Sequence, residues 1–176
     1  MENQQGLVHR YCGEGKGKTT AAIGLGVRAA GRGLRVLLFQ FRKDSGTGEL
    51  IPLQKLGVRV LPGVEKAVFT FRMTDAQKAE SRRFHDHRLR ECIDRCQRGE
   101  VDLLILDEAV GAYNKGLLDR EMLLAFLDNR PQGLEVVLTG RDPAPELLSR
   151  ADYITEMKKI RHPFEQGIPA RLGIEK

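Results

Sequence analysis

Apolar residues occur along the chain in short, nearly continuous runs, separated by longer and more polar segments. We expect strands at residues 7–11, 35–41, 58–61, 101–106, 135–139 and 153–157. The run at 35–41, with the sequence RVLLFQF, is apolar without strict alternation. Runs of this kind are typical of strands that are buried on both faces of a parallel sheet.

The segments between these runs carry the residue spacing of amphipathic helices. We expect helices at residues 19–30, 49–56, 74–98 and 119–128, and another from about residue 143. Thr74 and Gln77 form a capping-box pattern at the start of the longest helix. Asp119 and Asp142 are predicted to cap two later helices. The alternation of strands and helices predicts an α/β fold, in which helices flank a single parallel sheet.

Length and composition restrict the class of protein. The chain has 176 residues, so we expect residues 1–176 to form one domain. Apolar residues make up 41% of it and charged residues 30%, and no run of about eighteen apolar residues could cross a bilayer. The N-terminus lacks the pattern of a signal peptide, and Cys12, Cys92 and Cys96 cannot all pair. We therefore expect a cytoplasmic protein without a membrane segment.

The net charge of +5 fits either nucleic acid or a polyphosphate ligand. The basic residues are scattered among acidic ones, and there is no tryptophan to stack on bases. No motif that reads DNA or RNA is present. We therefore expect a phosphate-containing small molecule and no nucleic acid.

The first functional signal is the segment 11–20, YCGEGKGKTT, which joins the first predicted strand to the first predicted helix. Glycines allow consecutive backbone N–H groups to face one anion, and the following helix N-terminus adds partial positive charge. Lys18 adds a full charge, and Thr19 offers a hydroxyl to a magnesium ion. Gly13 lies one residue nearer to Gly17 than in the usual phosphate loop. The alternative is a glycine-rich turn with a surface lysine.

The second signal is the segment 101–108, VDLLILDE, an apolar strand that ends in two adjacent carboxylates. A buried strand can direct Asp107 or Glu108 to the sheet edge that carries the phosphate loop. Such an ending alone is often only a turn, but together with the loop it forms the two nucleotide motifs of the P-loop NTPase fold. We therefore expect a RecA-like P-loop architecture.

Further candidates follow other predicted strands. The loop after the second strand carries Arg42, Lys43, Asp44 and Ser45, which line the site or form an ordinary solvated turn. Arg141 follows the strand at 135–139 and can reach a phosphate.

Two other groups admit a structural interpretation. His85 lies on the buried stripe of the helix at 74–98, and we expect a structural histidine rather than a metal ligand. Phe69 and Phe71 are two residues apart, so in a strand both side chains would lie on the same face. Alternatively, they belong to a loop that presents aromatic rings to a flat ligand.

Several segments together resemble one known family. The shortened loop at 13–22 is similar to that of the ATP:corrinoid adenosyltransferases of the CobA/CobO/BtuR family. The order of further segments agrees with this family: FQF at 39–41, LDE at 106–108 with Tyr113, TGRD at 139–142 with AD at 151–152, and TEM at 155–157 with GIE at 173–175. The resemblance covers nearly the whole chain.

The resemblance implies a reaction between ATP and a reduced corrinoid. The 5′-deoxyadenosyl group moves to Co(I), and triphosphate leaves. The Co(I) ion is then the nucleophile. This agrees with the sequence, which has no Ser-His-Asp or Cys-His pattern that would supply a nucleophile from the protein. The family binds its nucleotide with the phosphates reversed, so that the loop holds the terminal phosphate.

Residue patterns and resemblance together give a set of site residues. We assign nucleotide binding to Gly13, Glu14, Gly15, Lys16, Gly17, Lys18, Thr19, Thr20 and Arg141. We assign catalysis to Lys16, Lys18 and Glu108, and the binding of Mg²⁺ or Mn²⁺ to Thr19, Asp107 and Glu108.

The resemblance also concerns the corrinoid and the protein's partners. Phe69 and Phe71 align with two aromatic residues that the family uses beside the corrinoid to exclude the lower axial ligand. This chain has Phe71 where tryptophan is common, and its N-terminal segment is short for a lid. A flavoprotein reductase that supplies Co(I) and a homodimeric state are further implications.

Two alternatives use the same nucleotide site. A RecA-like ATPase or small-molecule kinase would use Asp107 and Glu108 to position water or an acceptor hydroxyl. A nucleotide or corrinoid carrier would bind without turnover.

Overall fold

The protein contains one six-stranded sheet, seen in a computed structural model that describes residues 5–43, 46–64 and 70–175. The strands are β1 (Val8–Cys12), β2 (Val36–Gln40), β3 (Arg59–Val60), β4 (Leu103–Asp107), β5 (Glu135–Thr139) and β6 (Tyr153–Glu156). Each of the six predicted runs overlaps one of these strands, so the strand predictions are confirmed to within two residues at each end. β2 and β4 are buried along their whole length, which explains why their sequences do not alternate.

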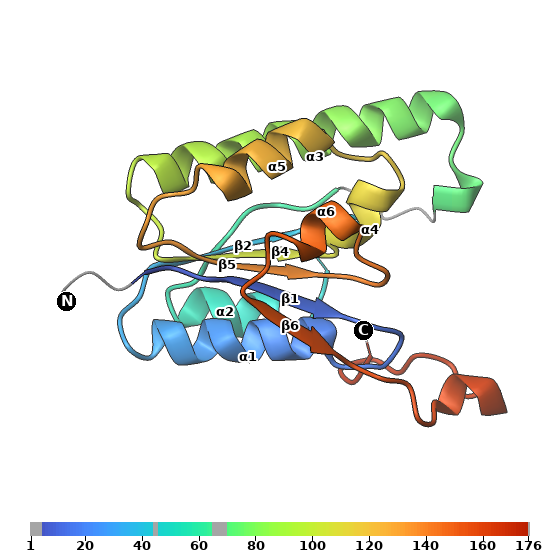
Figure 1. The fold of residues 1–176 in the computed structure, drawn as a ribbon. Coiled ribbons are helices and arrows are strands. Elements are labelled where there is room, and N and C mark those ends of the chain that lie inside the picture. The colour runs from blue at the N-terminus through green and yellow to red at the C-terminus, as the bar shows by residue number, and fades with distance from the viewer. Residues whose placement is uncertain (1–4, 44–45, 65–69, 176) are drawn as a thin grey trace.

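The strand order is β3-β2-β4-β5-β1-β6, and every neighbouring pair is parallel. All carboxyl ends therefore lie at one edge of the sheet, on the right in Figure 1. In the register of the sheet, Gln40 stands beside Asp107, and Tyr11 stands beside Thr139. Four adjacent strands, β2, β4, β5 and β1, thus end side by side, which is the arrangement that positions the candidate site.

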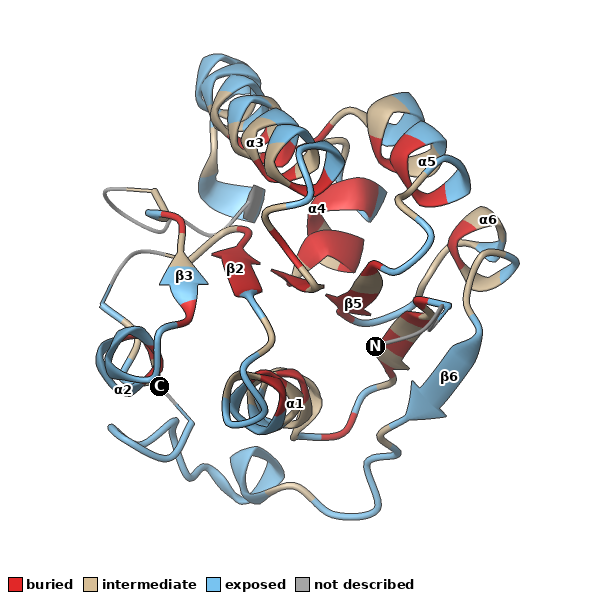
Figure 2. Cartoon of the chain, turned by 90° about the vertical axis from the view of Figure 1, so that its left-hand side faces the viewer, coloured by how far each residue is buried: buried red, intermediate tan, exposed pale blue. Residues whose placement is uncertain are grey.

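Helices cover both faces of the sheet (Figure 1). One face carries α1 (Lys18–Ala30) and α2 (Leu50–Lys55), and the other carries α3 (Asp75–Gln97), α4 (Ala109–Asn114), α5 (Arg120–Asp128) and α6 (Pro145–Leu148). Buried side chains form one apolar cluster on each face of the sheet, and Figure 2 shows them concentrated between the helices and the strands. This is the predicted α/β fold with a parallel sheet.

The predictions for the longest helix are confirmed in detail. Thr74 caps α3, and its hydroxyl accepts a hydrogen bond from the backbone N–H of Gln77 at 3.2 Å. The Gln77 side chain accepts one in return from the backbone N–H of Thr74 at 2.9 Å. His85, Leu89, Cys92 and Cys96 are buried on the face that meets the sheet. Asp119 likewise caps α5, where its carboxylate accepts from Met122 N.

One prediction about helices was wrong, and one helix was not predicted. Asp142 does not cap a helix, because α6 begins at Pro145 and its N-cap is Ala144. Asp142 instead has a left-handed backbone, with φ of 49°, and its carbonyl accepts a hydrogen bond from the Asn114 side chain. The sequence also did not indicate α4. That helix is almost entirely buried, so it lacks the polar face that makes a helix recognisable.

The segment before α3 is described only in part. Asp44, Ser45 and Phe69 lie outside the described residues, so the structure does not test the predictions made for them. Thr70–Arg72 forms a 3₁₀ turn, η1, rather than a strand.

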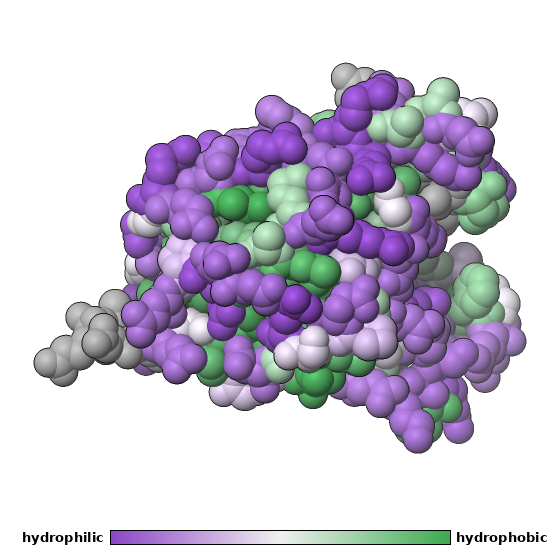
Figure 3. All heavy atoms as spheres, turned by 45° about the horizontal axis from the view of Figure 1, so that its top comes forward, coloured by the Kyte–Doolittle hydropathy of each residue, from purple (hydrophilic) through white to green (hydrophobic). Residues whose placement is uncertain are grey.

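The segment after β6 is exposed and contains one further 3₁₀ turn, η2 (Pro163–Gln166). Hydrophilic residues dominate the side of the molecule that Figure 3 shows, although apolar residues are visible between them. None of the helices in the described part of the chain has the length and apolar character needed to cross a bilayer.

Candidate nucleotide site

The loop between β1 and α1 has the geometry of a phosphate cradle. Gly17 is the N-cap of α1 and has a left-handed backbone, with φ of 118°, which favours glycine. Gly15 donates its backbone N–H to the carbonyl of Met157 at 2.6 Å, and a Cβ at Gly15 would lie 2.5 Å from that oxygen. The end of β6 therefore supports the loop. The first N–H groups of α1, which have no acceptor within the helix, lie directly after the loop.

Lys18 is part of the same cradle. Its ammonium donates hydrogen bonds to the carbonyls of Gly13 and Gly15, both at 2.7 Å. Partial burial lowers the pKa of Lys18, and the nearby charge of Arg141 lowers it further. A side chain that bridges the loop in this way holds a positive charge at its centre, where an anion would bind.

Asp107, at the end of β4, accepts hydrogen bonds from side chains of several elements of the site. Its side chain is fully buried, and its Oδ1 accepts hydrogen bonds from the hydroxyls of Thr19 at 2.8 Å and Thr139 at 2.7 Å. Its Oδ2 accepts from the Gln40 amide at 3.1 Å and from the Lys43 ammonium at 2.7 Å. The ends of β2, β4 and β5 and the first turn of α1 thus meet at one carboxylate. A buried carboxylate requires this degree of compensation.

Glu108 lies beside Asp107 but is more open to solvent. It is the N-cap of α4, with a left-handed φ of 59°, and its backbone N–H donates to the Thr139 hydroxyl at 2.9 Å. A carboxylate oxygen of Glu108 lies 3.6 Å from the guanidinium of Arg42. Burial and the charge of Arg42 lower the pKa of Lys115, while the charge of Glu108 raises it.

The remaining predicted residues lie on the outer side of the loop. Arg141 forms an ion pair with Glu14 at 3.1 Å, so the structure brings Arg141 to the phosphate loop as expected. Both side chains are more than half exposed, and a pair of this kind contributes little to stability. Lys16 and Thr20 are exposed. Hydrogen bonds from Arg171 lower the pKa of Glu175 to about 2, and the charge of Lys16 contributes to this lowering.

The donor set fits a hard divalent cation. Thr19 gives its proton to Asp107, which leaves the hydroxyl lone pairs for a metal, and Glu108 offers a partly exposed carboxylate. Mg²⁺ prefers oxygen ligands and takes several of them from waters and substrate phosphates. Within residues 5–43, 46–64 and 70–175, no three His, Cys, Asp or Glu side chains cluster as a complete cage. These residues would therefore complete a metal–nucleotide site rather than a metal site of protein ligands alone.

His85 has a structural role, as predicted. It is fully buried; its Nδ1 hydrogen-bonds to the carbonyl of Leu117 at 2.9 Å, and its Nε2 accepts the backbone N–H of Arg42 at 3.3 Å. Phe71 is not a core residue, because it is 79% exposed, with the guanidinium of Arg72 5.5 Å from its ring centroid. The exposed ring of Phe71 is accessible to a flat ligand, and the contact with such a ligand stays a prediction.

Two partners of Asp107, the side chains of Gln40 and Thr139, were not predicted from the sequence as site residues. Gln40 and Thr139 are the last residues of their strands, and this position is a signal that could have identified them. Lys43 was one of several candidates in the loop after β2, where nothing distinguished it from its neighbours. Only the strand order shows that these three side chains meet.

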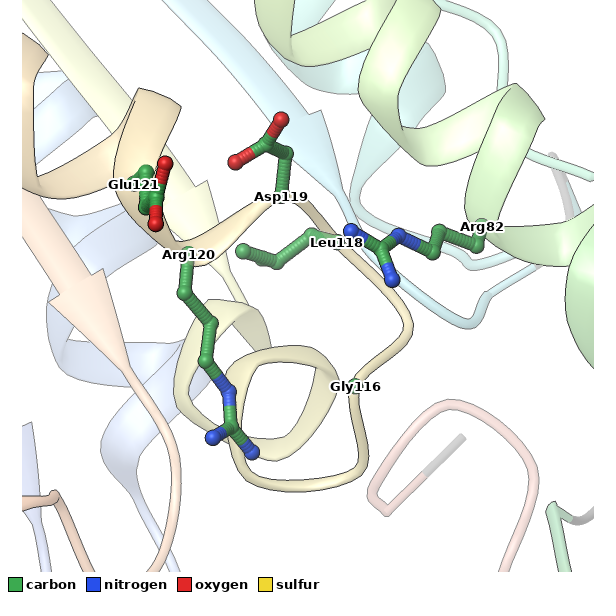
Figure 4. A pocket seen from close by; sticks show the side chains of 6 residues that line it. All are labelled: Arg82, Gly116, Leu118, Asp119, Arg120 and Glu121. Carbon is green, nitrogen blue, oxygen red and sulfur yellow. The ribbon is translucent and has the colours of Figure 1, made fainter.

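A separate cavity of about 430 Å³ lies between α3 and the segment that joins α4 to α5 (Figure 4). It is lined by Arg82, Gly116, Leu118, Asp119, Arg120 and Glu121. Arg82 comes from α3 and Arg120 from the start of α5. The lining carries both signs of charge and does not by itself indicate one class of ligand.

A phosphate loop between the first strand and the first helix, with a buried aspartate at the end of a nearby parallel strand, defines a P-loop nucleotide-binding protein. Residues 4–175 match the profile of the family described as "ATP:corrinoid adenosyltransferase BtuR/CobO/CobP". The chain belongs to this family, and it is an enzyme of the adenosyltransferase class.

Individual relatives agree with this assignment. The corrinoid adenosyltransferase of Pseudomonas aeruginosa is 32% identical over 174 residues, which cover 98% of this chain and 85% of the relative. The corrinoid adenosyltransferase of Escherichia coli K12 is 30% identical over 175 residues, which cover 99% of this chain and 87% of the relative. Over nearly its whole length, the chain is thus similar to corrinoid adenosyltransferases.

Proposed function

We propose that this enzyme transfers the 5′-deoxyadenosyl group of ATP to the Co(I) ion of a reduced corrinoid and releases triphosphate. One observation carries the proposal: the loop that matches the family lies at the buried carboxylate of Asp107 and is joined to it through Thr19. This arrangement suits a site that holds the whole triphosphate chain as a leaving group. The Co–C bond forms with the electron pair of Co(I), and the electrons of the C5′–O bond leave with the triphosphate.

Positioning and electrostatic stabilisation would provide the catalysis. Lys18 and the first backbone N–H groups of α1 would stabilise the negative charge that grows on the departing triphosphate. Lys16 and Arg141 add charge at the rim. A bound Mg²⁺ or Mn²⁺ would neutralise part of the triphosphate charge. Thr19, Asp107 and Glu108 are its proposed ligands. The proposed nucleotide ligands are Gly13, Glu14, Gly15, Lys16, Gly17, Lys18, Thr19, Thr20 and Arg141.

Phosphoryl transfer to water or to an acceptor is the competing function. Asp107 is poorly suited to activate a nucleophile there, because each of its oxygens already accepts two hydrogen bonds. Glu108 is the residue that favours this alternative, since its side chain is 33% exposed and lies next to the cradle. An enzyme of that kind would hydrolyse ATP without any corrinoid.

The corrinoid side of the site rests on the family resemblance and on Phe71. An exposed aromatic ring next to the start of α3 is suited to packing against a corrin face. Phe69, outside the described residues, is its proposed partner. The resemblance also supports a flavoprotein reductase as electron source, a homodimer, a cytoplasmic location, and residues 1–176 acting as one domain.

The test is an anaerobic reaction of the protein with MgATP and chemically reduced cobalamin. We expect a light-sensitive alkylcobalt spectrum and triphosphate in equal amounts, measured by absorbance and by phosphorus NMR. Formation of ADP and phosphate, with or without corrinoid, would overturn the proposal. The same assay with cobinamide and with an early biosynthetic corrinoid identifies the preferred acceptor.

Replacement of Lys18 by alanine tests the role of the phosphate loop in adenosyl transfer. We expect a fall of about 100-fold in kcat/KM, as for the loss of one preorganised donor to a developing anion. The exposed Lys55 at the end of α2 is the control, and Lys55→Ala should retain the activity of the parent enzyme.

A further inference from the structure

The segment after β2 supplies basic side chains to both carboxylates at the end of β4. Lys43 donates to Asp107 Oδ2 at 2.7 Å, and Arg42 lies 3.6 Å from Glu108. Neither residue belongs to the phosphate loop or to the strand that carries the carboxylates. Two adjacent cations therefore face two adjacent anions across neighbouring strands.

The fold holds this segment in place. Arg42 has a left-handed backbone, with φ of 61°, which is uncommon for a residue with a side chain. Its N–H donates to the buried His85 at 3.3 Å, and the preceding residue, Phe41, donates its N–H to the carbonyl of Asp107 at 2.9 Å. The Arg42 guanidinium packs over Gly111, where an added Cβ would lie 2.7 Å from it. The contacts of Phe41 and Arg42 thus fix the backbone that precedes Lys43.

Among the residues that the structure describes, Lys43 is the one cation that forms an ion pair with Asp107. Thr19, Thr139 and Gln40 are neutral donors, and the carboxylate is fully buried. The Lys43 side chain is 26% exposed, so its ammonium lies at the boundary between the buried carboxylate and solvent. A divalent cation that used the same oxygen would meet this ammonium at close range, where like charges repel strongly.

We propose that Lys43 is an internal counter-ion which competes with the divalent cation for Asp107, and which becomes a ligand of the triphosphate chain when the metal displaces it. The inference rests on the proposed nucleotide site and adds a positioning residue to it. Lys43 would keep the metal-binding carboxylate compensated in the free enzyme, and it would bring a further positive charge to the leaving group once metal and nucleotide arrive together.

Removal of the Lys43 ammonium should affect the two ligands in opposite directions: metal binding should become tighter, and triphosphate binding should become weaker. In Lys43→Met, Mn²⁺ alone should bind about tenfold more tightly, because its competitor is gone. Inorganic triphosphate at a saturating concentration of Mn²⁺ should bind about tenfold more weakly, because the displaced ammonium no longer supplies a charged hydrogen bond. A residue with a merely structural role would weaken both.

The measurements are an EPR titration of free Mn²⁺ and calorimetry with inorganic triphosphate, both on the full chain. Lys43→Arg keeps the charge and should retain most of the triphosphate affinity. Lys115→Met is the matched control, because Lys115 interacts with Glu108 and Arg42 by charge alone in the same neighbourhood. Equal effects of Lys43→Met and Lys115→Met, or weaker Mn²⁺ binding by Lys43→Met, would overturn the proposal.

A second pair of variants tests the same idea if Lys43→Met does not fold. Asp107→Asn releases Lys43 and should increase the affinity for triphosphate in EDTA several-fold. The double variant Asp107→Asn/Lys43→Met should lose this gain. A gain that persists in the double variant would mean that Asp107 only repels the phosphates, and would contradict the role of Lys43. None of these measurements uses a corrinoid, so they stand apart from any failure of adenosyl transfer.

Discussion

Arg10 is a fully buried charge in the centre of β1, away from the nucleotide site. Its Nη2 donates to the carbonyl of Leu147 at 2.9 Å, but among the described residues its Nε and Nη1 have no hydrogen-bond partner. Burial lowers the pKa of Arg10 to about 10. A buried, incompletely paired guanidinium costs stability, because its hydration is lost without full replacement.

We predict that Arg10→Met stabilises the protein by about 1 kcal/mol, since the cost of two unpaired buried groups exceeds that of one lost hydrogen bond. Urea unfolding at pH 7.5 measures the change. Arg90→Met, at an exposed position of α3, should change stability little. A destabilised Arg10→Met variant would contradict this interpretation.

At the scale of elements, α3 and α4 show two different origins of a helix. α3 has 23 residues, a complete capping box and a polar outer surface, so its sequence specifies its start. α4 has six residues, of which Ala109, Val110, Ala112 and Tyr113 are buried. Burial on several sides stabilises α4, and its first turn depends on the left-handed conformation of Glu108. A helix of that kind depends on its surroundings more than on local propensity.

We predict that Thr74→Ala lowers the free energy of unfolding by about 1 kcal/mol, the usual contribution of an N-cap hydroxyl. Thermal and urea unfolding measure it. Ser81→Ala, inside the same helix, is the control and should be neutral or slightly stabilising, because alanine has the higher helix propensity. An unchanged stability of Thr74→Ala would show that packing, rather than the cap, fixes the start of α3.

At the scale of the whole molecule, His85 connects three separate parts of the fold. It belongs to α3 and bonds to Leu117 after α4 and to Arg42 after β2. Burial lowers the pKa of His85 below its ordinary value of 6.5, and the charge of Arg42 acts in the same direction, while Leu117 and Asp86 oppose it. The folded protein therefore holds this histidine neutral at pH values where the unfolded chain takes up a proton.

We predict that stability falls as the pH decreases below about 6.5, because the unfolded state binds the proton first. The loss from this one group amounts to at most about 1.4 kcal/mol per pH unit. Urea unfolding between pH 7.5 and 5.5 measures the slope. His85→Gln should reduce the slope, whereas His87→Gln, at an exposed position of the same helix, should leave it unchanged. Equal slopes in the parent protein and His85→Gln would contradict the prediction.

The sequence by itself determined the chemical groups of the nucleotide site and the elements that carry them. The loop at 13–20 and the carboxylates at 107 and 108 are local patterns, and each follows a strand whose apolar run is visible in the sequence. Glycines, a helix start and a strand end are properties of neighbouring residues, so they can be read from the chain. Arg141 was also predicted, because it follows a predicted strand, and the structure places it beside Glu14 of the loop.

Only the tertiary structure decided which side chains meet at Asp107. The order β2-β4-β5-β1 brings Gln40, Lys43 and Thr139 to it, and no local pattern encodes which strands become neighbours. The hydroxyls on Asp107 come from residues 32 and 88 positions away in the chain. Asp142 shows the same limit, because the turn that it enters is set by Asn114 across the fold rather than by the helix that follows. Contacts between distant segments depend on packing of the whole sheet, and that packing is a property of the folded molecule.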